Sequence, residues 1–346
     1  ARLNAYQPGP LAAQFACHYD AKAGLYTATQ DGKGYPKTLE MVRTPDGVEL
    51  AWGHLCFHQL TKPLAPDYDV VSTTFRGKDT ATPTDWHDGA DIYREWALRQ
   101  PWCAQTIAER QDLPQWATHG SALLFCDLRS RWGNAASMTG IAAWIERSWA
   151  RHFGAAPAPT VIFFACEGLA AWASPGHLPL YPSDETFSQG ARALHDVGAH
   201  VYLAPSSYQW WLTYGKRPDG SFLWDGREDF EKTARAHAVI GRDGSPPIRH
   251  SPWLEGGDTT NLCHGDPWTR EWFSHLAEGL HGRGTDIFHL DQIISGHWPS
   301  GGVHNVCHSR THGHPPGHGL WETEVLRDQL GSLRKKLPNL LIAGFE

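Results

Sequence analysis

Short apolar runs alternate with stripes of apolar residues at helical spacing over residues 121–346. The runs are SALLFCDL (121–128), TVIFFACEG (160–168), HVYLAPSS (200–207), TDIFHLDQI (285–293) and LLIAGFE (340–346). The stripes between them are Ile141, Ile145 and Trp149; Phe187, Ala191 and Leu194; Trp268, Trp272, Leu276 and Leu280; and Trp321, Val325 and Leu333. A short continuous apolar run is typical of a strand covered on both faces, and the stripes predict amphipathic helices. The order strand, helix, strand predicts an α/β fold with five parallel strands.

This alternation favours a (β/α)₈ TIM barrel. An open doubly wound sheet is the alternative, but no glycine-rich phosphate-binding loop follows the first run. Five strands do not close an eight-stranded barrel, and the last run stops at Glu346. We therefore expect an incomplete barrel in a chain that is a fragment of a longer polypeptide.

The pattern changes before residue 85. The segments YTATQ, KTLEMVRT, GVELAWGHLCF and YDVVSTTF alternate polar and apolar positions, with turn sequences such as DGKG and TPDG between them. They predict antiparallel strands that form part of a β-sandwich. Residues 79–84 read as a linker, and Asp85 is a candidate N-cap for a helix carrying Ala90, Tyr93 and Ala97. We therefore predict a partial β-sandwich domain over 1–84 and a barrel domain over 85–346.

Charge and cysteine content exclude some classes of protein. The formal net charge is −7, and no basic run is longer than RKK at 334–336, which argues against a nucleic-acid partner. No apolar segment reaches the ~20 residues that a membrane-spanning helix needs. The seven cysteines form neither a disulfide framework nor a CxxC zinc pattern, so we expect buried free thiols. The cellular compartment is left undetermined.

Tryptophan content indicates a sugar ligand. The chain has seventeen tryptophans, and aromatic faces match the C–H faces of sugar rings. Tyr208, Trp210 and Trp211 lie together just after the third apolar run. We expect that they do not all point into the core, and that they form one wall of a sugar-binding pocket.

Acidic residues recur at the ends of the predicted strands. Asp127, Glu167, Asp291 and Glu346 lie at or just past the carboxyl ends of their runs, which is where barrel enzymes place their active sites. Parallel strands all point the same way. We therefore expect Asp127, Glu167 and Asp291 to surround one pocket.

A histidine-rich segment follows Asp291. Residues 297–319 contain His297, His304, His308, His312, His314 and His318 among glycines and prolines. Histidine side chains are common metal ligands, but the segment has neither an HExxH helix nor a carboxylate triad, so no metal is assigned. We expect instead a loop whose imidazoles, among them His312 and His314, bind a polar ligand above Asp291.

Several segments together resemble a known family. They are YDVVSTTF, DWHDGADIYREWALRQPWC, FHLDQI, CHSRTHGHPPGHG and LLIAGFE. Together they are similar to a largely uncharacterised bacterial family related to glycoside hydrolases, with a β-sandwich and a TIM barrel, distantly resembling endo-α-N-acetylgalactosaminidases and the α-galactosidase group. The resemblance covers nearly the whole chain.

The resemblance implies a retaining glycoside hydrolase without a cofactor. In the related enzymes an Asp ending the fourth strand is the nucleophile and a later Glu is the acid/base, which matches Asp291 and Glu346. From the FHLDQI motif, His289 and Gln292 are expected to contact the carbohydrate substrate. Two alternatives remain. They are a non-catalytic carbohydrate-binding protein on the same scaffold, and a metal-dependent hydrolase that uses His304, His308, His312 and His314.

Overall fold

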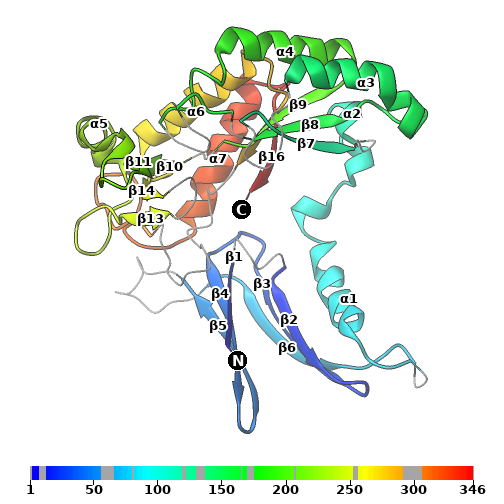
Figure 1. Cartoon of the computed structure of the whole chain (residues 1–346). Helices are drawn as coiled ribbons and strands as arrows, with labels where there is room; N and C mark the ends of the chain where they lie inside the picture. The colour runs from blue at the N-terminus through cyan, green and yellow to red at the C-terminus, as the bar shows by residue number, and fades with distance from the viewer. Residues whose placement is uncertain are drawn as a thin grey trace. The chain divides into compact units, whose positions relative to one another are not determined.

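The computed structural model describes most of the chain and divides it into two compact units. The described residues are 2–7, 13–55, 66–79, 82–118, 122–129, 137–164, 166–169, 175–205, 208–251, 256–290 and 306–345. One unit comprises Ala1–Asp112 and His318–Thr323, and the other comprises Leu113–Gly317 and Glu324–Glu346. Figure 1 labels their helices and strands.

The first unit contains two antiparallel three-stranded sheets. One has the order β1 (Arg2–Gln7), β4 (Lys37–Thr44) and β5 (Gly47–His54). The other has the order β2 (Phe15–Tyr19), β3 (Gly24–Gln30) and β6 (Asp69–Phe75). Trp52 of β5 donates from Nε1 to Thr27 Oγ1 of β3 at 3.1 Å, which links the sheets. The prediction of antiparallel strands before residue 85 is thus confirmed.

Helix α1 (Trp86–Ala97) packs on the second of these sheets. Its N-cap is Asp85, whose side chain accepts from the His87 N–H, while Asp88 completes a capping box. Tyr93 stacks on Phe15 of β2 with ring centroids 5.1 Å apart. The Asp85 cap and the helix are therefore confirmed. Two 3₁₀ turns follow, Pro101–Cys103 and Ile107–Glu109.

A buried ion pair lies in the loop between β3 and β4. Lys37 Nζ lies 2.5 Å from Asp31 Oδ2, and the two side chains are 0% and 1% exposed. The Asp31 carboxylate also accepts from the N–H groups of Lys33, Gly34 and Tyr35. Lys37 donates further to Gln14 Oε1 at 3.2 Å. The charges are thus matched by hydrogen bonds, as buried charges require.

The second unit is built on a five-stranded parallel sheet. Its strands are β7 (Leu123–Asp127), β8 (Thr160–Phe164), β9 (His200–Leu203), β15 (Ile287–Leu290) and β16 (Leu341–Phe345). They lie in chain order, and every neighbouring pair is parallel. The five predicted strands and their direction are thus confirmed.

Helices join these strands, as the apolar stripes predicted. They are α3 (Met138–Phe153), α4 (Asp184–Asp196), α6 (Pro267–His281) and α7 (Trp321–Lys336), and a short helix α2 (Gln115–Thr118) precedes β7. The helices α3, α4 and α6 begin at side-chain caps, Ser137, Ser183 and Asp266, each of which accepts from a backbone N–H in the first turn. Among the described residues, none of the helices combines the length and apolar character that a bilayer span requires.

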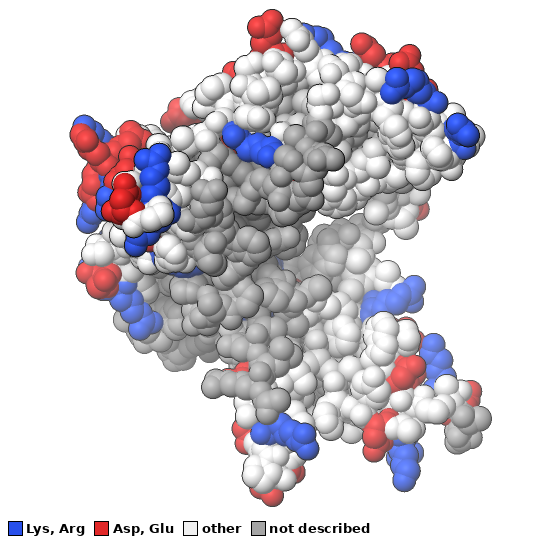
Figure 2. Space-filling model, in the orientation of Figure 1, with Lys and Arg blue, Asp and Glu red and all other residues white. Residues whose placement is uncertain are grey.

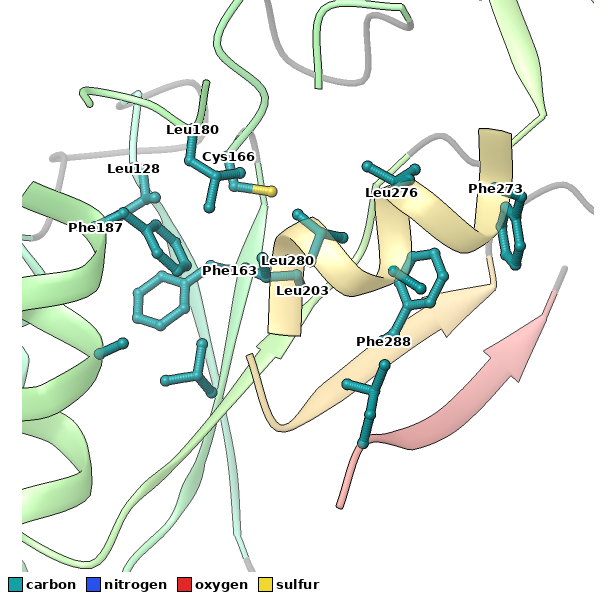
Figure 3. Packing of buried hydrophobic residues seen from close by; sticks show 14 of the residues in the cluster. Leu128, Phe163, Cys166, Leu180, Phe187, Leu203, Phe273, Leu276, Leu280 and Phe288 are labelled. Atoms are coloured by element: carbon teal, nitrogen blue, oxygen red, sulfur yellow. The ribbon is translucent and has the colours of Figure 1, made fainter. Parts of the chain in front are cut away.

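The core lies between this sheet and its helices. Figure 3 shows side chains of α4 and α6 meeting those of the strands. Phe187 of α4 meets Phe163 of β8 with centroids 6.5 Å apart, and Phe273 of α6 meets Phe288 of β15 at 5.2 Å. Each such side chain, fully buried, contributes roughly 1.5 to 3 kcal/mol of hydrophobic stabilisation. The core therefore fixes the sheet that carries the predicted site.

A long insertion separates β9 from α6. It contains β10 (Gln209–Trp211), β11 (Thr213–Lys216), β12 (Phe222–Asp225), α5 (Arg227–Thr233), a 3₁₀ turn (Arg235–His237), β13 (Arg249–Ser251) and β14 (Gly257–Asn261). The sheet β10-β14-β13 and the hairpin β11-β12 are antiparallel. Figure 2 shows acidic and basic side chains intermixed over α5, where Glu228 and Glu231 pair with Lys232 and Arg235. Sequence reasoning missed this insertion.

Asp286, just before β15, ties that strand to α4. Burial alone would raise the pKa of its carboxyl, but hydrogen bonds from the His195 and His200 rings and from the Val201 N–H outweigh burial and hold that pKa well below its usual range. The hydrogen bond to Asp286 in turn raises the pKa of His195. The pair therefore contributes most to stability where Asp286 is ionised and His195 is protonated.

We expect Asp286→Asn to destabilise the protein in a pH-dependent way. The pKa of Asp286 is lowered by folding, so its ionised carboxylate contributes fully to the free energy of unfolding above the pKa of an unfolded Asp, about 4. The pKa of His195 is raised by folding, so its protonated ring contributes fully below the pKa of an unfolded His, about 6.5. The loss should be about 1 to 3 kcal/mol between these limits, and smaller below pH ~4 and at pH above the raised pKa of His195. Urea unfolding across pH measures it, with Asp328→Asn at an exposed position on α7 as the control. A loss that does not vary with pH would contradict the pairing.

Candidate functional site

The register of the parallel sheet places side chains of adjacent strands in layers on one face. Asp127 pairs with Phe164, Phe163 with Leu203, and Leu203 with Phe288. The layer nearest the carboxyl ends therefore consists of Asp127, Phe164, Ala204 and His289, and the next consists of Phe125, Ile162, Tyr202 and Ile287. Because strand side chains alternate between faces, the intervening Phe163, Leu203 and Phe288 point to the helices. The candidate site is this layered face at its carboxyl end.

Asp127 lies at the end of β7, and Glu167 lies in the loop that follows β8. The Asp127 Oδ1 accepts from the Arg129 N–H at 2.7 Å. The Arg129 guanidinium lies 3.8 Å above the centroid of the Tyr181 ring and donates to the carbonyls of Glu167 and Gly168. Glu167 is 0% exposed and forms a bridge with Leu180, so its burial counts against the predicted contact with substrate. Arg129 therefore holds the loop after β8 against the end of β7.

Gly168 makes this loop possible. A Cβ built on Gly168 would lie 1.9 Å from the carbonyl oxygen of Pro179, so only glycine fits this close approach of two backbone segments. The Gly168 and Leu169 N–H groups donate to the His177 and Gly176 carbonyls. These contacts fix the two described parts of the connection, residues 166–169 and 175–180, against each other.

His289 and Tyr202 form a polar pair on the same face. The Tyr202 hydroxyl and His289 Nδ1 lie 2.6 Å apart, and both side chains are partly exposed. His289 was predicted from its motif, whereas Tyr202 was missed because nothing in a single apolar run reveals the register between strands. A hydroxyl beside an imidazole can donate to and accept from the hydroxyls of a polar ligand.

The two predicted catalytic residues lie outside the described residues. These are Asp291 and Glu346, and Gln292 lies there too. The described chain leads up to them, since β15 ends at Leu290 and β16 ends at Phe345. Their roles stay predictions.

The aromatic cluster after β9 is buried. Tyr208, Trp210 and Trp211 are 2%, 2% and 1% exposed, and the Tyr208 hydroxyl donates to Gln329 Oε1 at 2.7 Å. The expectation that they cannot all point into the core is wrong, because the missed β10-β14-β13 sheet encloses them. Their predicted contact with sugar is untested, but burial counts against it, and we leave them out of the proposed site.

His312 and His314 belong to a buried cluster with two cysteines. The donor atoms of Cys263, Cys307, His312 and His314 all lie within 4.8 Å of one another. His312 and His314 are 2% and 8% exposed, and both nitrogens of each ring already face protein partners. A role for these two rings in substrate binding is therefore not supported. The expectation of buried free thiols holds in part, because the six described cysteines are free but only Cys166, Cys263 and Cys307 are buried.

A protein-family model matches most of the chain. Residues 65–344 match the model of a family described as a domain of unknown function (DUF6259). The chain belongs to the DUF6259 family. No curated protein matches this DUF6259 chain.

Solved structures similar to this DUF6259 protein are glycoside hydrolases. The α-N-acetylgalactosaminidase NagBb from Bifidobacterium bifidum has a TM-score of 0.61 at 12% identity, covering 96% of this chain and 52% of its own. The α-galactosidase TtGalA from Thermus thermophilus has a TM-score of 0.52 at 10% identity, covering 96% and 52%. The GH36 α-galactosidase AgaA from Geobacillus stearothermophilus has a TM-score of 0.51 at 9% identity, covering 99% and 44%.

The chain thus spans about half the length of these structures. At such identities the similarity shows the fold. The resemblance found in the sequence, to an uncharacterised family with a fold similar to that of glycoside hydrolases, is therefore confirmed.

Proposed function

We propose that the chain carries the catalytic centre of a retaining glycoside hydrolase that cleaves α-linked galactose or N-acetylgalactosamine. The observation that supports this most is the shared layer of Asp127 and His289 at the carboxyl end of a sheet whose strands follow one another in chain order. Barrel enzymes assemble their active sites from residues in this position. The similar solved structures act on galactose-type sugars according to their names, which suggests the sugar class.

In this proposal, the five strands are part of a (β/α)₈ barrel and the antiparallel sheets of the first unit are part of a β-sandwich. The domain division at residues 84 and 85 is likewise a proposal. Asp291 directly follows Leu290, the last residue of β15, and the motif match gives it the role of the nucleophile that attacks the anomeric carbon.

The described side chains have defined roles in this proposal. The Asp127 carboxylate accepts hydrogen bonds from sugar hydroxyls. Arg129 orients this carboxylate through its N–H and holds the loop after β8 beside it through its guanidinium. His289 and Tyr202 form a second polar wall. Phe125, which is 67% exposed, stacks on Phe164 with centroids 5.9 Å apart and offers an apolar surface beside them.

Hydrolysis of 4-nitrophenyl glycosides tests the proposal. The full-length protein should release nitrophenol from the α-galactoside or the α-N-acetylgalactosaminide and not from the β anomers, and NMR should show retained configuration in the first product. Inversion would overturn the retaining mechanism. Inactivity on both α-glycosides, with binding of the free sugar, would favour a non-catalytic carbohydrate-binding protein.

Asp127→Asn tests the described part of the site. Asparagine keeps the oxygen that accepts from the Arg129 N–H but removes the charge. A charged hydrogen bond contributes ~1.5 to 3 kcal/mol, so we expect kcat/KM to fall roughly 10- to 100-fold. Asp328→Asn, at an exposed position on α7, is the matched control. Equal activity of the two variants would remove Asp127 from the site.

A further inference from the structure

Two sulfur atoms and two imidazole nitrogens converge in the second unit, none of them from the residues of the layered face. Cys263 follows β14, whereas Cys307, His312 and His314 lie between β15 and α7. Cys263 Sγ is 3.2 Å from His314 Nε2, and Cys307 Sγ is 3.4 Å from His312 Nδ1. The side chains of Cys263 and Cys307 are 1% and 0% exposed. The proposed glycosidase chemistry uses none of the four.

Backbone carbonyls fix which nitrogen of each ring faces the cluster. His312 Nε2 lies 2.9 Å from the Ala236 carbonyl oxygen, and His314 Nδ1 lies 2.8 Å from that of Pro315. A carbonyl oxygen only accepts, so these nitrogens carry the protons. In the neutral rings, the lone pairs are then on His312 Nδ1 and His314 Nε2, which are the atoms next to the sulfurs. This is the outer hydrogen bonding that metal-binding histidines use to orient their rings.

The sulfur atoms are held just as firmly. The Ile240 N–H donates to Cys307 Sγ at 3.5 Å, and the Cys307 carbonyl accepts from the Gly317 N–H. The Cys263 N–H donates to the His237 carbonyl at 2.9 Å. Val239 packs against both cysteines in an apolar cluster. All four donors are therefore preorganised by their own surroundings.

The spacing fits one tetrahedral ion. A zinc ion with bonds of ~2.3 Å to sulfur and ~2.0 Å to nitrogen has edges of roughly 3.3 to 3.8 Å between its ligands. The two sulfur-to-nitrogen distances, 3.2 and 3.4 Å, are close to such edges, and all the donors lie within 4.8 Å of one another. Two thiolates would balance the charge of the ion, which a buried site without carboxylates requires.

We propose that Cys263, Cys307, His312 and His314 bind a structural zinc ion. Thiolate and imidazole ligands in a tetrahedral set select zinc among the common divalent ions. Four protein ligands fill the tetrahedron, whereas catalytic zinc keeps one position for water. The site therefore does not support the metal-dependent hydrolase considered from the sequence. It joins the segment before α7 to the loop between β14 and α6.

Metal content of the purified full chain tests the site. Elemental analysis should find about one zinc per chain in the unchanged protein, and less than about a tenth of that in Cys263→Ser and in His312→Ala. Cys166→Ser and His308→Ala are the matched controls, a buried thiol and a loop histidine outside the cluster, and both should keep the zinc. Replacing the zinc with cobalt should give the thiolate charge-transfer band and the d–d bands of a tetrahedral centre.

The zinc content and the cobalt spectrum of the unchanged protein test the zinc site even if the cluster variants do not fold. About one zinc per chain together with the tetrahedral cobalt spectrum supports the site. Protein that folds with no zinc and takes up no cobalt would overturn it. A Cys263 to Cys307 disulfide found by mass spectrometry without reduction would also overturn it. Neither outcome bears on glycosidase activity, so the two proposals fail separately.

Discussion

Asp291→Ala is expected to abolish turnover of 4-nitrophenyl α-glycosides, lowering kcat roughly 10⁴-fold or more. A good leaving group needs no protonation, but the anomeric carbon must still be attacked, so an activated substrate does not rescue the loss of a nucleophile. The rate of nitrophenol release measures this. A reduction of less than about 100-fold in the turnover of the activated substrate by Asp291→Ala would exclude Asp291 as the nucleophile.

Glu346→Ala provides the contrast within the same experiment. An acid/base contributes roughly 10² to 10⁴ in rate by protonating the leaving oxygen, so nitrophenyl substrates should lose far less than natural glycosides. Added azide should then yield a glycosyl azide of retained configuration. Equal losses on good and poor leaving groups, without rescue by azide, would assign the acid/base to another carboxylate.

Asp31→Ala is expected to destabilise the first unit by about 3 to 5 kcal/mol, the scale for a buried charge that loses its partner. The Lys37 ammonium would be left fully buried, and the N–H groups of Lys33, Gly34 and Tyr35 would lose their acceptor. Chemical denaturation of the full chain, followed by amide hydrogen exchange of peptides from β3, β4 and β5, reports on this unit.

Asp67→Ala is the matched control for that prediction. Asp67 pairs with Lys33, but the two side chains are 46% and 57% exposed, so water screens the pair and the loss should be small beside that of Asp31→Ala. The double variant Asp31→Leu with Lys37→Met should recover much of the stability lost in Asp31→Ala, because it removes both charges. Similar losses in Asp31→Ala and Asp67→Ala would contradict a special role for the buried pair.

Local patterns predicted the parallel sheet well. The run ending in FHLDQI became β15, and the stripe from Trp268 to Leu280 became α6, because periodicity directly reports which faces are covered. The Asp85 cap was readable because its hydrogen bond is made within one turn. In each case the decisive interaction lies within a few residues along the chain.

Features that depend on distant pairings were missed. Trp210 and Trp211 were expected to line a pocket. Their strand pairs with β14, which begins at Gly257, far along the chain, so the local sequence does not reveal that they are buried. The Cys/His cluster combines Cys263 with Cys307, and no spacing rule for zinc motifs covers that separation. Tyr202 was missed for the same reason, since its pairing with His289 follows from strand register.

The ends of the insertion after β9 lie side by side. Gln209 pairs with Asn261, and the Leu262 N–H donates to the Tyr208 carbonyl at 2.9 Å, so the chain leaves and returns at nearly one point. The parallel sheet and α6 therefore meet the insertion at one closed neck. Tyr208, Trp210 and Phe230 of the insertion belong to the same buried core as Phe288 of β15, so the part next to the neck is held to the sheet by packing as well. Loop-closure entropy grows only slowly with length, so changes in length away from that core, for example in the exposed turn between β11 and β12 at residues 217–221, should cost the sheet little.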